Sequence, residues 1–411
     1  MKRILVVSDA VYPLATSGFA VAVRPVIDGL LDRGFKVLHM ARGTAFNKDD
    51  MPAEWKNKPI TVAACPPDDL NGYRYLGYLL DTEDKFEPID AIVYVADPES
   101  IRSWRTNVQA RSINLNRPMP TVTYGPTEGG PLLRPNSTCL TEIVATGGIV
   151  STYTEFSANV MTDAIRMAMA PGEECPYFDI RIIPHGVDHA PFRKLDDDAR
   201  QRIRKAFGWE NKIVVTNVAR NAGRKMWVSL FKAIKLLEKD YPNLILYAHT
   251  AGFEGYAYGG HNLLEIARNI GITDRVIHPD RIPNAWHGVP YEQMIAVYNA
   301  SDMFVSPSGA EGWNLPVNEA AACGCPVICT AYSGMWEQAK EYATPLEPEN
   351  WFTVQDGTEL AIVSPGQIAE KIDEQIQHPA GLVERGLEIA KTRTWQPLRD
   401  GIVRMVEEVL L

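Results

Sequence analysis

The sequence predicts an α/β fold with two domains, each built around a parallel β-sheet. Three observations predict this class. The chain has 411 residues, more than one compact core usually holds, so two domains of about 200 residues each are expected. An apolar run, a helical pattern and a second apolar run open the chain, and a similar order recurs over residues 301–334. Strands that alternate with helices in this way form parallel sheets.

The composition is ordinary for a globular protein. Apolar residues make up 45% of the chain and charged residues 22%. The chain starts directly on a strand and has no run of 18 apolar residues, so we expect no signal peptide, no transmembrane span and a cytoplasmic location. The net charge of −10 gives no general attraction to nucleic acid or anionic lipid, although it is compatible with a local basic patch.

The six cysteines indicate reduced, mostly buried thiols. Most are scattered, and the close set falls at the end of a predicted helix and the start of the next strand: Cys65, Cys139, Cys175, Cys323, Cys325 and Cys329. A C-x-C pair without a second cluster or a nearby histidine is a weak metal motif, so we expect no metal site.

Residues 2–41 contain the first β-α-β unit. Residues 2–8 are a continuous apolar run with β-branched members, as expected of a buried parallel strand. Apolar residues at positions 23, 26, 27, 30 and 31 mark one face of a helix, and Gly34 ends it before a strand at residues 35–41. Ligands of such units bind beyond the carboxyl ends of the strands. The loop that contains Gly18 lies there, although a lone glycine is more typical of a turn.

The next segment supplies three more strands and a candidate loop. The strands are expected at residues 91–95, 121–124 and 149–153, after an irregular stretch with one helix near residues 73–84. The strand at 121–124 runs into G-P-T-E-G-G-P-L, and Glu128 lies in that loop. Loops in this place on an open α/β sheet often carry the chemistry. A catalytic carboxylate and a loop carboxylate that faces water are equally compatible with the sequence.

The second half begins with a helix whose charges follow its dipole. Residues 196–208 place acids at the positive end and bases toward the negative end: Asp196, Asp197, Asp198, Arg202, Arg204 and Lys205. This explains the aspartates better than a metal-binding D-x-D motif. Further elements are expected at residues 212–218 and 244–249 as strands and at 291–302, 365–377, 379–392 and 395–411 as helices.

Three cations follow the strand at residues 212–218. They are Arg220, Arg224 and Lys225, in the segment A-R-N-A-G-R-K. Cations at the carboxyl end of a parallel strand can bind a diphosphate and stabilise its charge as it leaves. We expect Arg224 to be an extra charge that faces solvent.

Residues 301–334 are the most informative stretch. A strand at 303–305 leads into a loop, Pro316 suits the start of a helix, Gly324 suits its end, and residues 325–330 form a strand. Seven residues separate two carboxylates, Glu311 and Glu319. Between them lie the peptide N–H groups of Gly312, Trp313, Asn314 and Leu315. Because a helix start binds anions, this predicts a site for a phosphorylated, hydroxyl-rich ligand.

The segment E-G-W-N-L-P-x-x-E-A-x-A-C-G-x-P-V-I resembles the signature of glycosyltransferase family 4, the retaining transferases with the GT-B fold. I-P-H-G-V-D at residues 183–188 is similar to the family's entry into its second domain. The resemblance implies two Rossmann-like domains that face each other across a cleft. Residues 1–180 would form the acceptor domain, together with a last helix near 395–411 that crosses back to it. Residues 181–394 would bind the nucleotide sugar.

The resemblance also implies roles for the candidate residues. Glu311 would meet hydroxyls of the donor sugar, the amides of Gly312, Trp313, Asn314 and Leu315 would meet sugar and diphosphate, and Glu319 would hold the ribose. Arg220 and Lys225 match the family's arginine and lysine in spacing and would stabilise the leaving diphosphate. Gly18 stands where the family usually has a Gly-Gly pair that approaches the donor diphosphate and the acceptor.

The chain departs from the commoner family pattern on the acceptor side. No histidine follows the strand at 121–124, and P-T-E-G resembles the P-I-D-G of a subgroup. This would make Glu128 the group that orients or deprotonates the acceptor hydroxyl. His185 replaces the family's asparagine, and a structural role in its turn is favoured over a nucleotide contact.

The function implied is metal-independent, cofactor-free, retaining transfer of a sugar from a nucleotide-diphosphate sugar to a hydroxyl. A nucleotide-sugar epimerase of the same fold and a catalytically inactive nucleotide-binding scaffold stay open as alternatives. A glycan, lipid, small metabolite or modified nucleobase all stay open as the acceptor. The acidic charge weighs against a nucleic-acid acceptor without excluding it. A local basic face in the first domain is one open possibility, from Arg102, Arg105, Arg111, Arg117 and Arg134.

Overall fold

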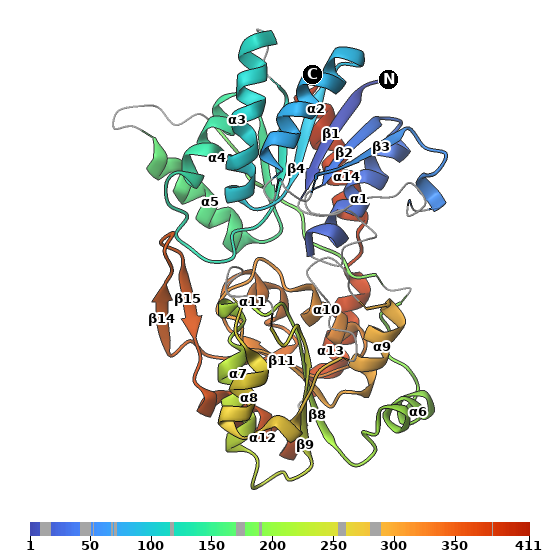
Figure 1. Cartoon of the computed structure of the whole chain (residues 1–411), viewed down its shortest axis with the longest axis vertical. Helices are drawn as coiled ribbons and strands as arrows, with labels where there is room; N and C mark the ends of the chain where they lie inside the picture. The colour runs from blue at the N-terminus through green and yellow to red at the C-terminus, as the bar shows by residue number, and fades with distance from the viewer. Residues whose placement is uncertain are drawn as a thin grey trace.

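The computed structural model describes residues 1–8, 18–41, 51, 53–66, 69, 72–115, 119–169, 177–188, 191–253, 260–279, 289–379 and 381–411. Arg117, Cys175 and the side chain of Arg111 lie outside the described residues. Within them the chain forms two α/β domains stacked along the long axis of the molecule, and both termini lie in the first domain (Figure 1).

The first domain is a doubly wound parallel sheet. Its strand order is β3-β2-β1-β4-β5-β6-β7, and every neighbouring pair is parallel. This order, with helices on both faces, is the Rossmann arrangement. The strands are β1 (Arg3–Ser8), β2 (Lys36–Ala41), β3 (Ile60–Ala64), β4 (Ala91–Val95), β5 (Thr121–Tyr124), β6 (Ile149–Thr152) and β7 (Arg181–Ile182).

Side chains of β1 alternate between two cores, one on each face of this sheet. Ile4 and Val6 pack against α1 and α14, whereas Leu5 and Val7 pack against the core built by α2 to α5. Both sets are fully buried, which is why the strand is apolar without a break. The helices are α1 (Gly18–Arg33), α2 (Tyr73–Phe86), α3 (Pro98–Leu115), α4 (Asn136–Ala145), α5 (Glu155–Ala168) and α14 (Gln396–Val409), with the short η2 (Ala53–Trp55).

The second domain repeats the arrangement. Its strand order is β10-β9-β8-β11-β12-β13, again parallel throughout. The strands are β8 (Ile213–Val218), β9 (Leu244–His249), β10 (Val276–Ile277), β11 (Met303–Ser306), β12 (Val327–Thr330) and β13 (Ala343–Leu346). The helices are α6 (Asp197–Phe207), α7 (Trp227–Leu236), α8 (Leu263–Ile270), α9 (Tyr291–Ala300), α10 (Leu315–Ala322), α11 (Ser333–Ala339), α12 (Pro365–Gln377) and α13 (Leu382–Thr392), with η3 (Gly223–Lys225) and η5 (Thr273–Arg275).

The predicted crossing of the last helix is confirmed. Helix α14 lies beside α1 in the first domain (Figure 1). It buries Leu398, Ile402, Met405 and Val406 in the core that contains Ile4 and Val6. A Cβ added at Gly29 of α1 would lie 2.8 Å from the carbonyl oxygen of Arg399, so the two helices pack with almost no space between them.

The domain crossover falls slightly later than the predicted boundary at residue 180. Strand β7 is residues 181–182, and it pairs with β6 in the first sheet. The chain therefore enters the second domain through the I-P-H-G-V-D segment at residues 183–188.

Several elements were not predicted, among them helices α3, α4 and α7, strand β3 and the hairpin that follows β13. Strand β3 lies in the stretch that prolines interrupt, where the apolar pattern is weak. The antiparallel hairpin β14 (Asn350–Thr353) and β15 (Glu359–Ile362) follows β13, and all four residues of β14 are exposed, so the strand leaves no pattern of alternating burial. The hairpin reaches the first domain, where the amide of Glu359 donates to the carbonyl of Gly130 over 2.9 Å.

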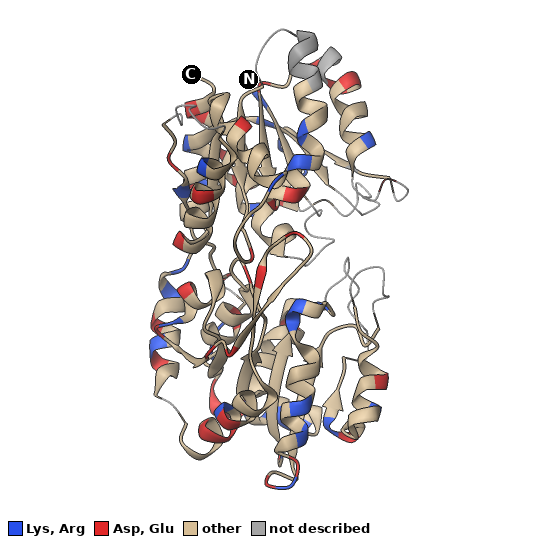
Figure 2. Ribbon diagram, turned by 90° about the vertical axis from the view of Figure 1, so that its left-hand side faces the viewer, with Lys and Arg blue, Asp and Glu red and all other residues tan. Residues whose placement is uncertain are grey.

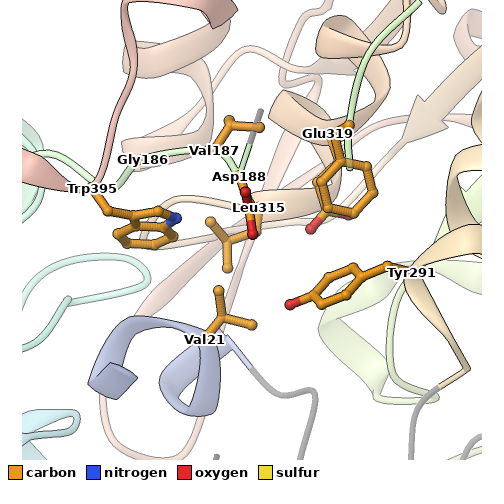
Figure 3. Close-up of a pocket in the computed structure, with 9 residues that line it drawn as sticks. Val21, Gly186, Val187, Asp188, Tyr291, Leu315, Glu319 and Trp395 are labelled. Carbon is orange, nitrogen blue, oxygen red and sulfur yellow. The ribbon is translucent and has the colours of Figure 1, made fainter. Parts of the chain in front are cut away.

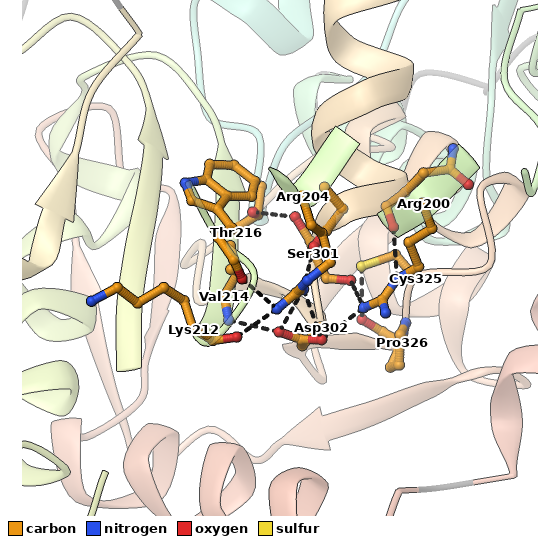
Figure 4. Close-up of polar contacts among 12 residues, drawn as sticks. Arg200, Arg204, Lys212, Val214, Thr216, Ser301, Asp302, Cys325 and Pro326 are labelled. Atoms are coloured by element: carbon orange, nitrogen blue, oxygen red, sulfur yellow. Dashed lines mark hydrogen bonds and ion pairs between the residues drawn. The ribbon is translucent and has the colours of Figure 1, made fainter. Parts of the chain in front are cut away.

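Helix α6 has the predicted arrangement of charges. Asp196 caps the helix, accepting from the amide of Ala199 over 2.7 Å, and Arg204 and Lys205 lie in its last turn. Arg204 is also buried. Its guanidinium contacts the carboxylate of Asp302 at 3.1 Å and donates to the carbonyl of Ala300 (Figure 4). Asp302 also accepts from the amide of Val214 over 2.8 Å, so this network anchors the start of β11 to β8.

Acidic and basic residues are interspersed on both domains (Figure 2). Arg105 is buried and lies 3.6 Å from Glu142, so it does not contribute to a basic face of the first domain. Among the described helices, none combines the length and apolar character that a membrane crossing would need.

Truncating the buried Leu398 to alanine is expected to destabilise the protein by about 2 to 5 kcal/mol, because it leaves a cavity where α14 enters the first core. Urea unfolding of Leu398→Ala and wild type measures this. The matched control is Leu382→Ala on α13, whose side chain is exposed and whose loss should cost under about 0.5 kcal/mol. Equal effects of the two variants would contradict the packing of α14 described above.

Candidate functional site

Three loops that follow parallel strands meet between the domains. Glu128 follows β5, Arg224 and Lys225 lie in η3 after β8, and Glu311 follows β11. Arg224 donates to Glu128, and Lys225 donates to Oε1 of Glu311. Arg224 Nη1 also lies 3.1 Å from that same Glu311 oxygen. The four side chains therefore form one chain of charges from the first domain to the second.

The burial of this charge cluster is uneven. The side chains of Glu311 and Lys225 are 7% and 12% exposed, whereas that of Glu128 is 41% exposed. Buried charges are stable only when they are paired, and Glu311 has two cations beside it. Glu128 is therefore the side chain of the cluster that is most open to solvent.

The pKa values of the cluster follow from burial and pairing. Burial would raise the pKa of Glu311, but Arg224 and Lys225 outweigh it and hold that pKa below its usual value. Burial and the neighbouring Arg224 lower the pKa of Lys225, against the opposing effect of Glu311. Burial raises the pKa of Glu128, with Arg224 opposing and Glu311 adding to the rise. The two carboxylates thus have different proton affinities, as acid–base sites require.

The loop after β11 is held by backbone contacts. The amide of Glu311 donates to Oγ of Ser333 over 2.9 Å, and the amide of Met335 donates to the Glu311 carbonyl over 3.2 Å. The amide of Gly309 donates to the carbonyl of Arg224 over 2.8 Å. These bonds fix Glu311 relative to both Arg224 and α11, so its carboxylate is placed before any ligand arrives.

The start of α10 presents backbone N–H groups at its positive end, and the anion binding predicted for them stays a prediction. Asn314 caps it with φ of 71°, a left-handed conformation that asparagine tolerates better than most residues. Its Nδ2 donates to Oγ of Ser306 over 2.9 Å. In the described parts of the chain, no protein acceptor receives the amides of Gly312, Trp313, Asn314 or Leu315. These donors at the positive helix end are suited to phosphate oxygens.

The same loop is packed against the first domain. The side chains of Trp313 and Leu315 belong to the core of that domain, together with Val23 and Tyr153. A Cβ added at Gly312 would lie 2.3 Å from Cβ of Pro126, in the loop that carries Glu128. Gly18 is the first residue of α1, and a Cβ there would lie 4.0 Å from Cδ1 of Leu315. Gly18 therefore lies beside the loop that follows β11, and the role predicted for it stays a prediction.

Glu319 lies apart from the charge cluster, one turn into α10. It accepts a hydrogen bond from the hydroxyl of Tyr298 over 2.7 Å. Burial raises the pKa of Glu319 to about 7, although the Tyr298 bond opposes the rise. Glu319 lines a pocket in which Trp395 and Tyr291 lie on opposite sides (Figure 3). The other lining residues are Val21, Gly186, Val187, Asp188, Phe192 and Leu315.

His185 is surrounded by aromatic rings at the crossover. Its ring lies 3.8 Å from that of Tyr153 and 5.6 Å from that of Trp313, and its Nδ1 is 2.8 Å from the hydroxyl of Tyr124. Burial lowers its pKa to about 3, so the ring is neutral at physiological pH. This environment favours the structural interpretation of His185.

The three cations after β8 are placed differently from one another. Arg220 is exposed, and its backbone carbonyl accepts from the indole of Trp227 over 3.0 Å. Arg224 was expected to face solvent, and that expectation is wrong: its side chain is 27% exposed and pairs with two carboxylates. The sequence could not show this, because adjacent residues of an irregular turn do not reveal which one points inward. The role predicted for Arg220 stays a prediction.

Sequence reasoning also missed Ser333, which supports the Glu311 loop, and Glu337, which bonds the two domains away from the charge cluster. Ser333 bonds the amide of Glu311, and the carboxylate of Glu337 accepts from the first amides of α5 in the other domain, at 2.8 Å from Glu155 and 2.7 Å from Phe156. Neither residue belongs to a motif that the sequence marks, so only the fold reveals them.

Comparison with curated proteins finds relatives that act on sugars by name. The chain is 28% identical over 168 residues to mannosylfructose-phosphate synthase of Agrobacterium fabrum, a match covering 38% of this chain and 34% of that protein. It is 28% identical over 233 residues to D-inositol 3-phosphate glycosyltransferase of Rhodococcus erythropolis, covering 54% and 47%. The chain thus spans a third to a half of the length of these relatives.

Solved structures share the fold over the whole chain. Sucrose-phosphate synthase from Thermosynechococcus elongatus has a TM-score of 0.74 at 15% identity, with 99% of each chain covered. Anabaena HepE in complex with UDP and glucose has a TM-score of 0.68 at 17% identity, covering 99% of this chain and 100% of that one. The architecture predicted from the sequence, GT-B, is thereby confirmed.

The raised pKa of Glu319 predicts a pH-dependent stability. Its pKa is 4.5 when exposed and about 7 in the native chain, so native Glu319 binds the extra proton between these values. The stability that this proton contributes is lost as pH rises from about 4.5 to about 7. Glu319→Gln cannot titrate at this position. The unfolding free energy of the variant minus that of wild type should therefore increase as pH rises from about 4.5 to about 7.

Urea unfolding at several pH values measures that difference. Glu292→Gln, at an exposed position of α9, controls for the loss of one charge. Parallel pH profiles for Glu319→Gln and wild type would show that Glu319 does not titrate in this way.

A family model covers most of the second domain. Residues 199–379 match the model described as glycosyl transferases group 1. The match includes η3, the loop of Glu311 and helix α10, which together form the candidate donor site. Most of the second domain of this chain thus matches the glycosyl transferases group 1 model, and the whole chain has the GT-B fold.

Proposed function

We propose that this protein is a glycosyltransferase that moves a sugar from a nucleotide-diphosphate sugar to an acceptor hydroxyl, with retention of configuration at the anomeric carbon. The observation that carries the proposal is the buried contact of Lys225 with Glu311, next to the unpaired amides at the start of α10. A cation and backbone donors for the diphosphate thus lie beside a carboxylate for the sugar hydroxyls.

The comparisons support a nucleotide sugar as the donor. HepE has been solved with UDP-glucose, and a mannosyltransferase of Mycolicibacterium smegmatis that is 28% identical over 189 residues is GDP-mannose-dependent by name. We propose that Glu319 and the pocket beside it take the ribose, because a carboxylate flanked by Tyr298 and Tyr291 can accept hydrogen bonds from vicinal hydroxyls.

In the proposed reaction Lys225, Arg220 and the α10 amides stabilise the charge that grows on the departing diphosphate. Each such donor contributes about 3 kcal/mol in the transition state. Since these groups already supply positive charge, we propose that transfer needs neither a metal ion nor a cofactor. Glu311 is paired with two cations, which makes its carboxylate a poor nucleophile. We therefore propose substitution from the face the diphosphate leaves, with its oxygen helping to take the acceptor proton.

The acceptor would bind against the first domain. Glu128 projects from the loop after β5 and is the carboxylate of the cluster most open to solvent. We propose that it orients or deprotonates the acceptor hydroxyl. We further propose that the enzyme works in the cytoplasm, because the five described cysteines are buried free thiols, as is typical of a reducing compartment.

The test is a thermal-shift and hydrolysis screen of the purified protein against a panel of nucleotide sugars that includes UDP-glucose and GDP-mannose, without acceptor. A bound donor stabilises the native state by the logarithm of its concentration over its Kd. We expect one donor to raise the Tm and to be slowly hydrolysed to nucleotide. A donor that is consumed by isomerisation would instead indicate an epimerase. Binding without any turnover would indicate an inactive scaffold.

Lys225→Ala is expected to lower the rate of donor turnover by about 10²- to 10³-fold, because it removes a cation from the leaving group. Turnover of the donor chosen by the screen measures this. Lys232→Ala, at an exposed position of α7 seven residues after Lys225, is the matched control and should retain full activity. Undiminished turnover in Lys225→Ala would remove Lys225 from the mechanism.

A further inference from the structure

We propose that Arg224 is a positioning residue: it holds the acceptor-side carboxylate of Glu128 against the donor-side carboxylate of Glu311. The inference rests on the proposed function, since it assigns a task within that site. The pair expected from the family resemblance is Arg220 and Lys225, and Arg224 lies outside it. Its guanidinium is nevertheless the group that joins the two domains at the charge cluster.

The contacts of Arg224 show how it acts. One end of the guanidinium donates to Glu128, in the first domain, and Nη1 lies 3.1 Å from Oε1 of Glu311, in the second. Its backbone carbonyl accepts from the amide of Gly309 over 2.8 Å, which ties η3 to the loop that leads to Glu311. Both the main chain and the side chain of Arg224 are therefore fixed relative to Glu311.

The loop of Glu128 is held from both sides as well. The carbonyl of Gly130 accepts from the amide of Glu359 over 2.9 Å, and a Cβ at Gly129 would lie 2.7 Å from the carbonyl oxygen of Glu359. On the other side, Pro126 packs directly on Gly312. The main chain of the loop therefore has little freedom. The direction of the Glu128 side chain is then fixed by its hydrogen bond from Arg224.

Arg224 also counters the negative charge around Glu128. Among the described residues, the charged groups that act most on this carboxylate are Arg224, Glu311, Lys225 and Asp97. Burial raises the pKa of Glu128, Arg224 lowers it, and Glu311 and Asp97 raise it further. Without Arg224, two like charges would act on the carboxylate, and of these four groups Lys225 alone would oppose them. Removal of Arg224 should therefore both misdirect Glu128 and favour its protonated form.

A competing role for Arg224 is direct binding of the donor diphosphate. The two roles give different results. A phosphate-binding cation acts on donor affinity whether or not Glu128 is present. A residue that positions Glu128 acts on the rate, and only while Glu128 is intact.

The experiment measures hydrolysis of the donor selected from the UDP-glucose and GDP-mannose panel, with water as acceptor, in Arg224→Gln, Glu128→Gln and the double variant. We expect Arg224→Gln to lower kcat by roughly 10²-fold, as misplacement of a reacting group does, with KM for the donor unchanged. The double variant should be no slower than Glu128→Gln alone. The acid limb of the kcat profile should move to higher pH in Arg224→Gln, and Arg224→Lys should recover part of the rate.

Glu337→Gln is the matched control, because Glu337 also bonds the two domains but does so at the start of α5, away from the cluster. It should leave kcat and its pH profile unchanged. The proposal is overturned by a raised donor KM in Arg224→Gln, by additive losses in the double variant, or by an equal loss in Glu337→Gln. These results leave the transferase proposal standing, whereas a wild-type protein that binds no nucleotide sugar overturns both.

Discussion

The buried carboxylate of Glu311 is the constraint on which the site depends. A charge that is only 7% exposed must be paired, and the pairing fixes where its partners come from. Lys225 and Arg224 come from the turn after β8, and Arg224 extends the pairing to Glu128 after β5. One electrostatic requirement thus brings together the carboxyl ends of three strands from two domains.

The loop between β11 and α10, which we call the donor loop, makes contacts in both domains. Glu311 and the α10 amides are parts of the second domain by sequence, yet Trp313 and Leu315 are buried in the first core. Trp313 also lies beside His185, whose ring contacts Tyr153 and Trp395 near the crossover. Any motion that separates the domains must therefore move the donor loop or break this aromatic cluster. On the proposed function, these contacts couple donor binding to the arrangement of the domains.

Much of the fold was predictable because the buried strands of a parallel sheet have continuous apolar sequences. The runs at residues 91–95, 121–124 and 244–249 match β4, β5 and β9 to the residue. Strand β3 was missed where prolines weaken the run, and the hairpin β14–β15 was missed because β14 is exposed along its length. Burial is what gives a strand a sequence pattern, so exposed elements are the ones that pattern analysis loses.

The sequence by itself determined the residue types of the site, their order and the strand ends on which they lie. It identified Glu311, Glu319, Lys225 and Glu128 as candidates, because spacing along the chain and strand ends are local properties. Only the tertiary structure decided which of them meet. It paired Arg224 with two carboxylates where solvent exposure was expected, separated Glu319 from the charge cluster, and placed Ser333 beside Glu311 and Glu337 between the domains. These contacts join residues from 21 to 182 positions apart, and no local pattern encodes such a pairing.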